Sequence, residues 1–241
     1  MKKAIIFTIF DRVQYLKQSL DSWKNVRGIN EYDIFFKIEP SDHQEGIIDV
    51  INNFDSHRNS VSTILINEKV LGNGFNSWEA FEYLFVKYDF VILAEDDIVV
   101  SKDILEYFDE TEKMFREDNE IAVISANTKW NTNDSSAVIR EQGFNGLIWG
   151  TWKKCWVNYF RDTWDKDYTS SIEQCGWDWN LNLRVMPSNN LKNINPLVSR
   201  SNHIGILGLH CNELIFDDTQ SPSFKEDNIW STIKEVVGSD I

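Results

Sequence analysis

Three consecutive carboxylates, Glu95, Asp96 and Asp97, follow an apolar run that ends at Ala94. Three acids in a row beside a buried strand repel one another and lose hydration unless a cation balances them. A hard divalent cation such as Mg²⁺ or Mn²⁺ takes oxygen ligands from carboxylates and from a diphosphate together. The same acids could instead form a solvated turn before a helix capped by Ser101. The position of the triplet at the end of a strand favours the metal site.

A second group of chemically capable residues is the run Gly176-Trp177-Asp178-Trp179-Asn180. An acid between two indole rings is partly desolvated, which raises its pKa toward the range in which a general base works. Indole rings also have flat apolar faces with one polar N–H group, and such faces suit sugar rings. Tryptophans are also common core residues. We predict Asp178 as the catalytic base and Trp149, Trp177 and Trp179 as sugar-stacking residues.

Polar residues after the first two apolar runs are candidates for binding a nucleotide. Backbone amides and a guanidinium could meet its phosphates, and an acid could accept hydrogen bonds from its base or ribose. The alternative for the first of these loops is a helix start capped by Asp11. The candidates are Thr8, Phe10 and Arg12 after the first run, and Glu39 and Asp42 after the second. Further downstream, His210 could complete a metal site that begins at Asp97, although a lone histidine is more often structural.

The elements that must position these residues alternate between strand and helix through residue 125. This alternation is typical of an α/β fold with a largely parallel sheet covered on both faces. Ligands of such sheets bind outside the carboxyl ends of the strands, where the acidic triplet lies. Apolar runs predict strands over 5–10, 34–38, 61–66, 90–94 and 121–125, and helical spacing predicts helices around 13–23, 47–54, 78–88 and 104–115.

Composition limits the classes of function. The 241 residues, 42% of them hydrophobic, predict one globular domain over 1–241, with a donor-binding half over 1–125 and an acceptor-binding and catalytic half over 126–241. The net charge of −14 argues against gripping free nucleic acid, whose phosphates need Lys and Arg. No run approaches the roughly 20 apolar residues of a membrane span. The 3 cysteines include no CxxC pair, so we expect a cytoplasmic protein.

These motifs, in this order, resemble the GT-A class of glycosyltransferases, and within it the N-acetylglucosaminyltransferase I type and related bacterial nucleotide-sugar transferases. The resemblance rests on the runs from Phe10 to Leu20, from Leu71 to Phe81 and from Val91 to Asp97, and on Trp177-Asp178. Val13 stands where relatives often have proline, a difference that the first turn of a helix tolerates.

The resemblance implies a GT-A fold, with a Rossmann-like sheet and helices on both faces, and it implies roles for single residues. Asp97 would bind Mn²⁺ or Mg²⁺ together with His210, while Glu95 and Asp96 would contact the donor. Asp178 would be the base of an inverting reaction. The implied donor is a nucleoside-diphosphate sugar, preferably UDP-linked, and the implied acceptor is a hydroxyl of a glycan, a lipid-linked molecule or another compound.

Two other functions use parts of the same pattern. A sugar nucleotidyltransferase shares the sheet and the metal, but it needs a glycine-rich basic loop after the first strand, and that loop here has neither glycine nor lysine. A carbohydrate- or nucleotide-binding module without turnover would use the aromatic residues but would not need Asp178 beside a metal site.

Overall fold

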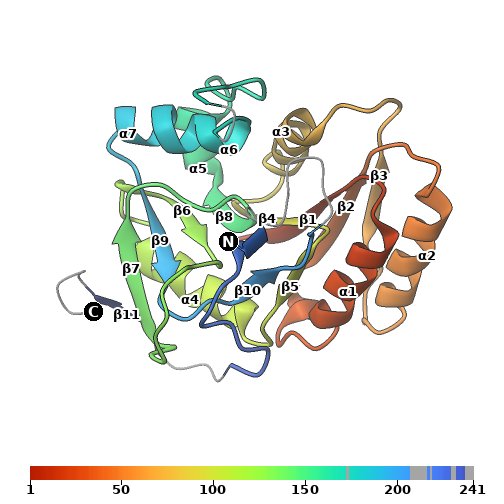
Figure 1. Ribbon diagram of the computed structural model, residues 1–241, viewed down its shortest axis with the longest axis horizontal. Helices are drawn as coiled ribbons and strands as arrows, with labels where there is room; N and C mark the ends of the chain where they lie inside the picture. Colours follow the sequence, from red (N-terminus) through yellow and green to blue (C-terminus); the bar gives the residue numbers. More distant parts are fainter. Residues whose placement is uncertain (172–173, 207–215, 218, 229–231, 237–241) are drawn as a thin grey trace.

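The computed structural model of the protein describes residues 1–171, 174–206, 216–217, 219–228 and 232–236. Strands and helices alternate through its first half, as the sequence predicts (Figure 1). Short apolar runs form the strands, which are largely buried except for the edge strand β3, and amphipathic runs return across them as helices. These elements are β1 (Lys3–Ile9), α1 (Val13–Trp23), β2 (Asp33–Ile38), α2 (Gln44–Asp55), β3 (Thr63–Ile66), α3 (Asn73–Leu84), β4 (Phe90–Glu95), α4 (Ile104–Phe115) and β6 (Ile121–Ser125).

Among the described residues, the central sheet has nine strands in the order β11-β7-β9-β6-β8-β4-β1-β2-β3. The second half of the chain contributes β7 (Ala137–Glu141), β8 (Ile148–Trp152), β9 (Lys192–Pro196) and β11 (Lys234–Val236). β8 runs antiparallel between β4 and β6, while β1 is parallel to both β2 and β4, and β6 is parallel to β9. The predicted α/β class and the mostly parallel sheet are confirmed, and the sheet continues through both halves.

Helices cover the sheet on both faces, and ring contacts identify which helix lies on which face. On one face, Phe7 of β1 packs against Trp23 of α1, with ring centroids 5.4 Å apart. On the other face, Phe81 of α3 contacts Trp149 of β8 at 5.1 Å. Figure 1 shows α5 (Lys153–Cys155), α6 (Trp177–Asn180) and α7 (Met186–Ser188) on the same side as α3. No helix within the described ranges is long and apolar enough to cross a bilayer.

A small second sheet follows the acidic triplet directly. β5 (Ile98–Val100) pairs antiparallel with β10 (Ser201–His203), and His203 lies opposite Ile98. The expected cap at Ser101 is wrong, because α4 begins at Ile104 with Asp103 as its N-cap residue. The Ser101 hydroxyl donates instead to the Asp103 carboxylate at 2.6 Å.

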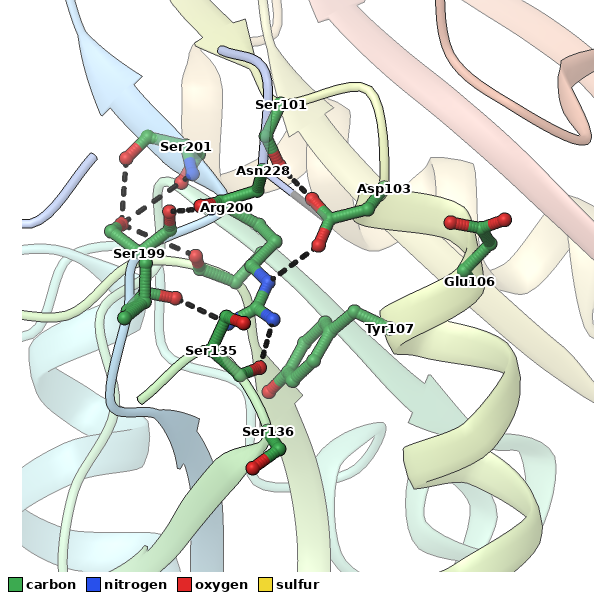
Figure 2. A network of polar contacts seen from close by, with 12 residues as sticks. Ser101, Asp103, Glu106, Tyr107, Ser135, Ser136, Ser199, Arg200, Ser201 and Asn228 are labelled. Carbon is green, nitrogen blue, oxygen red and sulfur yellow. Dashed lines mark hydrogen bonds and ion pairs between the residues drawn. The ribbon is translucent and has the colours of Figure 1, made fainter. Parts of the chain in front are cut away.

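A buried ion pair joins α4 to the connection between β9 and β10. Arg200 Nε lies 3.3 Å from Asp103 Oδ2, and both side chains are fully buried. The same guanidinium donates to the carbonyl oxygens of Val198, at 2.5 Å, and of Ser135, and it lies over the ring of Tyr107 (Figure 2). The network satisfies a charge that would otherwise be very costly to bury. It thereby fixes β10 next to β5.

We expect Asp103→Ala to lower the free energy of unfolding by about 3–5 kcal/mol, because it leaves the Arg200 guanidinium buried without its counter-ion. Chemical denaturation at pH 7 measures this loss. The double variant Asp103→Ala/Arg200→Met should lose much less than the sum of the two single changes, since no buried charge is then left unpaired. Strictly additive losses would show that the pair is not coupled.

Candidate active site

The acidic triplet lies where β4 ends, beside the loop that leaves β1. Thr8 and Glu95 are partners in the parallel pairing of these strands, so the residues that follow each of them are neighbours. Arg12 Nη1 lies 2.5 Å from Asp97 Oδ2, and Nη2 forms a second ion pair with Asp96 Oδ1. Asp96 and Asp97 are each 2% exposed. One guanidinium therefore bridges two buried carboxylates, as a bidentate cation does.

The three carboxyl groups differ in their pKa values because their partners differ. Burial and the charge of Asp97 raise the pKa of Glu95 to about 8. Burial also raises the pKa of Asp96, to about 6, although the charge of Arg12 opposes it. For Asp97, burial acts in the same direction, but the hydrogen bond with His203 and the charge of Arg12 outweigh it and lower the pKa. Asp97 is thus the carboxyl group kept ionised most firmly.

His203 completes the surroundings of the Asp97 carboxylate. Its Nε2 atom lies 3.1 Å from Asp97 Oδ2, while Asp97 Oδ1 is buried and has no hydrogen-bond partner among the described residues. Gly205 leaves the space beside them open, since a Cβ atom there would lie 2.1 Å from Asp97 Oδ2 and 2.9 Å from His203 Nε2. Carboxylate oxygen is a ligand that suits Mn²⁺ and Mg²⁺, and a neighbouring imidazole nitrogen can be a second ligand of a transition-metal ion.

His203 was not among the residues predicted for this site, and the prediction for His210 stays untested. His210 lies outside the described residues. His203 belongs to the same run of the sequence, and its pairing with Ile98 brings it to Asp97. Within the described ranges, no cluster of three or more His, Cys, Asp or Glu side chains is arranged to hold a metal.

The predicted nucleotide-binding residues lie around the same edge of the sheet but differ in exposure. Glu39 follows β2 and is 3% exposed; its Oε2 accepts a hydrogen bond from the Leu71 amide at 2.7 Å, and its Oε1 has no partner in the described part of the chain. Burial raises the pKa of Glu39. Asp42 is exposed at the turn before α2, and Phe10 is 36% exposed. Of the two acids that the sequence left open, Glu39 is the one turned inward.

Asn73, at the start of α3, is a further residue of the site that sequence reasoning did not identify. Its Nδ2 atom donates to Glu95 Oε1 at 3.3 Å. Gly72, with φ of +81°, precedes it and allows the chain to turn from the Leu71–Glu39 contact into the helix. The pair Gly72-Asn73 in the sequence is a turn signal, but nothing local indicates that the amide reaches Glu95.

Asp178 lies against the loop before β8. A Cβ atom on Gly146 would lie 3.2 Å from the Asp178 Cβ atom, so this loop and the first turn of α6 are in direct contact. The next residue of the loop, Leu147, accepts a hydrogen bond from the Glu95 amide at 3.4 Å. Asp178 and Glu95 therefore contact adjacent residues of this loop, Gly146 and Leu147. The lack of a side chain at Gly146 permits this approach.

Two of the three predicted sugar-stacking tryptophans are core residues. Trp149 is fully buried and Trp177 is 4% exposed. Their rings are stacked with centroids 5.7 Å apart, and the other face of Trp177 is covered by Trp164 at 4.7 Å and an interplanar angle of 8°. Because neither has an open face, Trp149 and Trp177 cannot stack on a sugar in this structure. Only Trp179, which is partly exposed, keeps the predicted role.

The sequence of this chain matches the model of a known protein family. A sequence model of the GNT-I family matches residues 77–210, more than half of the chain. This stretch contains the triplet, Asp178 and His203.

Solved structures share the fold. S. aureus TarS 1-349 is 13% identical with a TM-score of 0.61, and the match covers 86% of this chain and 61% of that one. A mannosyltransferase from Pyrobaculum calidifontis, solved with GDP-Man and Mn²⁺, is 10% identical with a TM-score of 0.57, covering 81% and 54%. Mouse xyloside xylosyltransferase 1 is 10% identical with a TM-score of 0.52, covering 79% and 84%.

The chain thus spans about three fifths of the TarS fragment and about half of the mannosyltransferase. At these identities the likeness shows the fold, and that fold is the GT-A arrangement that the motifs predicted. The family match covers the residues on which the resemblance rests from position 77 onward. This chain therefore belongs to the GNT-I family of GT-A-fold glycosyltransferases.

Proposed function

We propose that the protein transfers a sugar from a nucleoside-diphosphate sugar, with UDP as the preferred nucleotide, to an acceptor hydroxyl. The observation that carries the proposal is the Asp97 carboxylate, which follows strand β4 and faces His203 while one of its oxygens has no partner among the residues that the structure describes. Membership of the GNT-I family and the shared fold support the same reaction class. The donor would bind at the carboxyl ends of the parallel strands, where ligands of open α/β sheets bind.

In this proposal, Asp97 and His203 hold a Mn²⁺ or Mg²⁺ ion. Mn²⁺ accepts carboxylate oxygen and imidazole nitrogen ligands together, which Mg²⁺ does less readily, and the mannosyltransferase with the same fold was solved with Mn²⁺. When bound, the ion neutralises charge on the departing diphosphate. The other ligands come from the diphosphate and from water.

In this proposal, Arg12 pairs with the carboxylates when no donor is bound and with the diphosphate when a donor is bound. Without a donor its guanidinium bridges Asp96 and Asp97. A diphosphate at the same edge offers oxygen pairs of matching geometry, so Arg12 is positioned to bind them and to release Asp97 for the metal. Glu39, with one carboxylate oxygen unpartnered, accepts hydrogen bonds from the ribose or base. Thr8, Phe10, Glu95 and Asp96 complete the donor site.

Asp178 takes the proton from the attacking acceptor hydroxyl. Its contact with the loop at Gly146, next to the residue that binds the Glu95 amide, supports this assignment. A base on the face opposite the leaving diphosphate gives a single displacement with inversion. Trp179, two helical positions from the core ring of Trp177, is the aromatic surface available for the acceptor sugar.

A thermal-shift panel tests the donor site. We expect one nucleoside diphosphate, with UDP as the first candidate, to raise the unfolding midpoint by about 5–10 °C at about 100 times its dissociation constant. The shift should require Mn²⁺, disappear with EDTA, and be absent from Asp97→Ala. The panel contains UDP, GDP, CDP, ADP and the corresponding nucleotide sugars.

Asp49→Ala is the matched control, because it removes one exposed aspartate on α2 and changes the net charge equally. It should shift as the parent does. A nucleotide shift that is equal in Mn²⁺ and EDTA would contradict the metal site, and binding of sugars without any nucleotide would favour a carbohydrate-binding module.

A further inference from the structure

The ring of His203 is held from the side opposite Asp97. Its Nδ1 atom lies 2.8 Å from the Thr219 hydroxyl, and the same hydroxyl lies 2.8 Å from the Phe216 carbonyl oxygen. The Phe216 ring covers one flank of the imidazole, with centroids 5.7 Å apart. Both ring nitrogens of His203 therefore have a defined partner, one on the acidic triplet and one on Thr219.

The hydrogens in this chain of contacts can be counted. A hydroxyl has one hydrogen, and the Phe216 carbonyl can only accept, so Thr219 donates to it. The hydroxyl oxygen must then accept from His203, which places a hydrogen on Nδ1. In the neutral ring the lone pair is consequently on Nε2, and it faces Asp97 Oδ2 at 3.1 Å. Two acceptors at this distance require a proton or a metal ion between them.

The two residues after Thr219 form hydrogen bonds with β10, the strand that contains His203. Gln220 Nε2 donates to the His203 carbonyl oxygen at 3.0 Å, and Gln220 Oε1 accepts from Asn202 Nδ2 at 2.9 Å. The Ser221 amide donates to Asn202 Oδ1 at 2.9 Å. Three consecutive residues thus contact β10 from one side. They lie beyond residue 210, where the match to the family model ends.

We propose that Thr219 is a positioning residue, which fixes His203 in the form with hydrogen on Nδ1 and so aims Nε2 at the metal position beside Asp97. The inference rests on the proposed function, because it concerns the metal-binding pair assigned there. Partners of this kind on the far nitrogen of a ligating histidine fix its tautomer and orientation, and their loss typically weakens metal binding about 10- to 100-fold.

Mn²⁺ titration of the nucleotide-free protein by calorimetry tests the inference without any need for turnover. Thr219→Val keeps the shape and removes the hydroxyl, and we expect about 10- to 100-fold weaker Mn²⁺ binding. Thr219→Ser restores the hydroxyl and should bind within about threefold of the parent. Thr132→Val is the control, since Thr132 is also half-buried and donates to a backbone carbonyl oxygen, that of Leu197, away from the site.

Further comparisons separate positioning from general stability and from failure of the proposed function. The unfolding midpoint without metal should be similar in the Val and Ser variants, and the two should differ once Mn²⁺ is added. Parent-like affinity of Thr219→Val, or equally weak binding by both variants, would overturn the role of the hydroxyl. Absence of Asp97-dependent Mn²⁺ binding in the parent would overturn the metal site itself.

Discussion

With Asp178 replaced by asparagine, we expect sugar transfer to fall by about 10²- to 10⁴-fold while donor binding persists. Asparagine keeps the size of the side chain and a hydrogen-bonding oxygen, but it cannot take a proton. The proposed donor-binding residues do not include Asp178, so the Mn²⁺-dependent thermal shift should remain as in the parent.

The measurement is release of the nucleoside diphosphate from the donor that gives the largest shift, with water or an acceptor present. Asp167→Asn is the matched control: it removes an exposed acid whose partner is Lys166, and it should turn over normally. Parent-like turnover of Asp178→Asn would remove Asp178 from the role of base. Loss of donor binding together with turnover would show instead that Asp178 supports the donor site.

The first half of the fold could be predicted because its signals are local. Runs such as Ile5–Ile9 are apolar apart from Thr8, and such short, mostly apolar runs are typical of strands buried on both faces in an α/β domain. The acidic triplet could be placed for the same reason, since it directly follows a strand, and the ends of parallel strands meet at one edge. Arg12 was predicted on this basis, and it lies against Asp96 and Asp97.

The second half was not predicted in detail, because its elements depend on distant partners. The sequence of β8 is Ile148-Trp149-Gly150-Thr151-Trp152, and it lacks the alternation of apolar and polar residues that would indicate an antiparallel strand. It pairs with β4 because Gly150 leaves room for the Phe90 ring, which would lie 2.3 Å from a Cβ atom there. The helical turns that follow are short and irregular, so their period is not visible.

The tryptophans show why composition could not assign stacking residues. Trp177 and Trp179 flank Asp178 alike in the sequence, yet only Trp177 points into the core, because α6 turns by about 100° per residue. Trp149 is buried with it, on the face of the sheet that α3 covers. Burial of an individual indole depends on this three-dimensional arrangement, whereas the sequence shows only that many indoles occur together.

The contact between His203 and Asp97 could not be predicted from local sequence, because the two residues are 106 positions apart. His203 and His210 lie in one run, and the resemblance pointed to the histidine at its end. Pairing of β10 with β5 brings His203 to Asp97, and this register is held by contacts that are themselves distant in sequence, including Arg200 with Asp103. A ligand supplied by such a strand is determined by tertiary structure, so no local spacing could have identified it.

Gly205→Ala is expected to weaken Mn²⁺ binding by at least about 100-fold, a larger effect than loss of an outer partner, and thereby to abolish the metal-dependent nucleotide shift. The added methyl group would lie 2.1 Å from Asp97 Oδ2 and 2.8 Å from Asp97 Cγ. Either the new methyl group or the Asp97 carboxylate must move. The backbone at residue 205 cannot move away freely, because the neighbouring Ile204 amide donates to the Asp97 carbonyl oxygen at 2.9 Å. The carboxylate is then displaced from His203.

Calorimetric Mn²⁺ titration of folded protein measures the loss, with Gly46→Ala as control. A Cβ atom on Gly46 would make an ordinary 3.4 Å contact with Val13, and alanine within α2 should leave metal binding unchanged and stability equal or slightly higher. Parent-like Mn²⁺ affinity of Gly205→Ala would mean that the ion does not occupy the space between Asp97 and His203. A variant that binds Mn²⁺ weakly but unfolds at the parent's metal-free midpoint would show that this glycine is required for the site rather than for the fold.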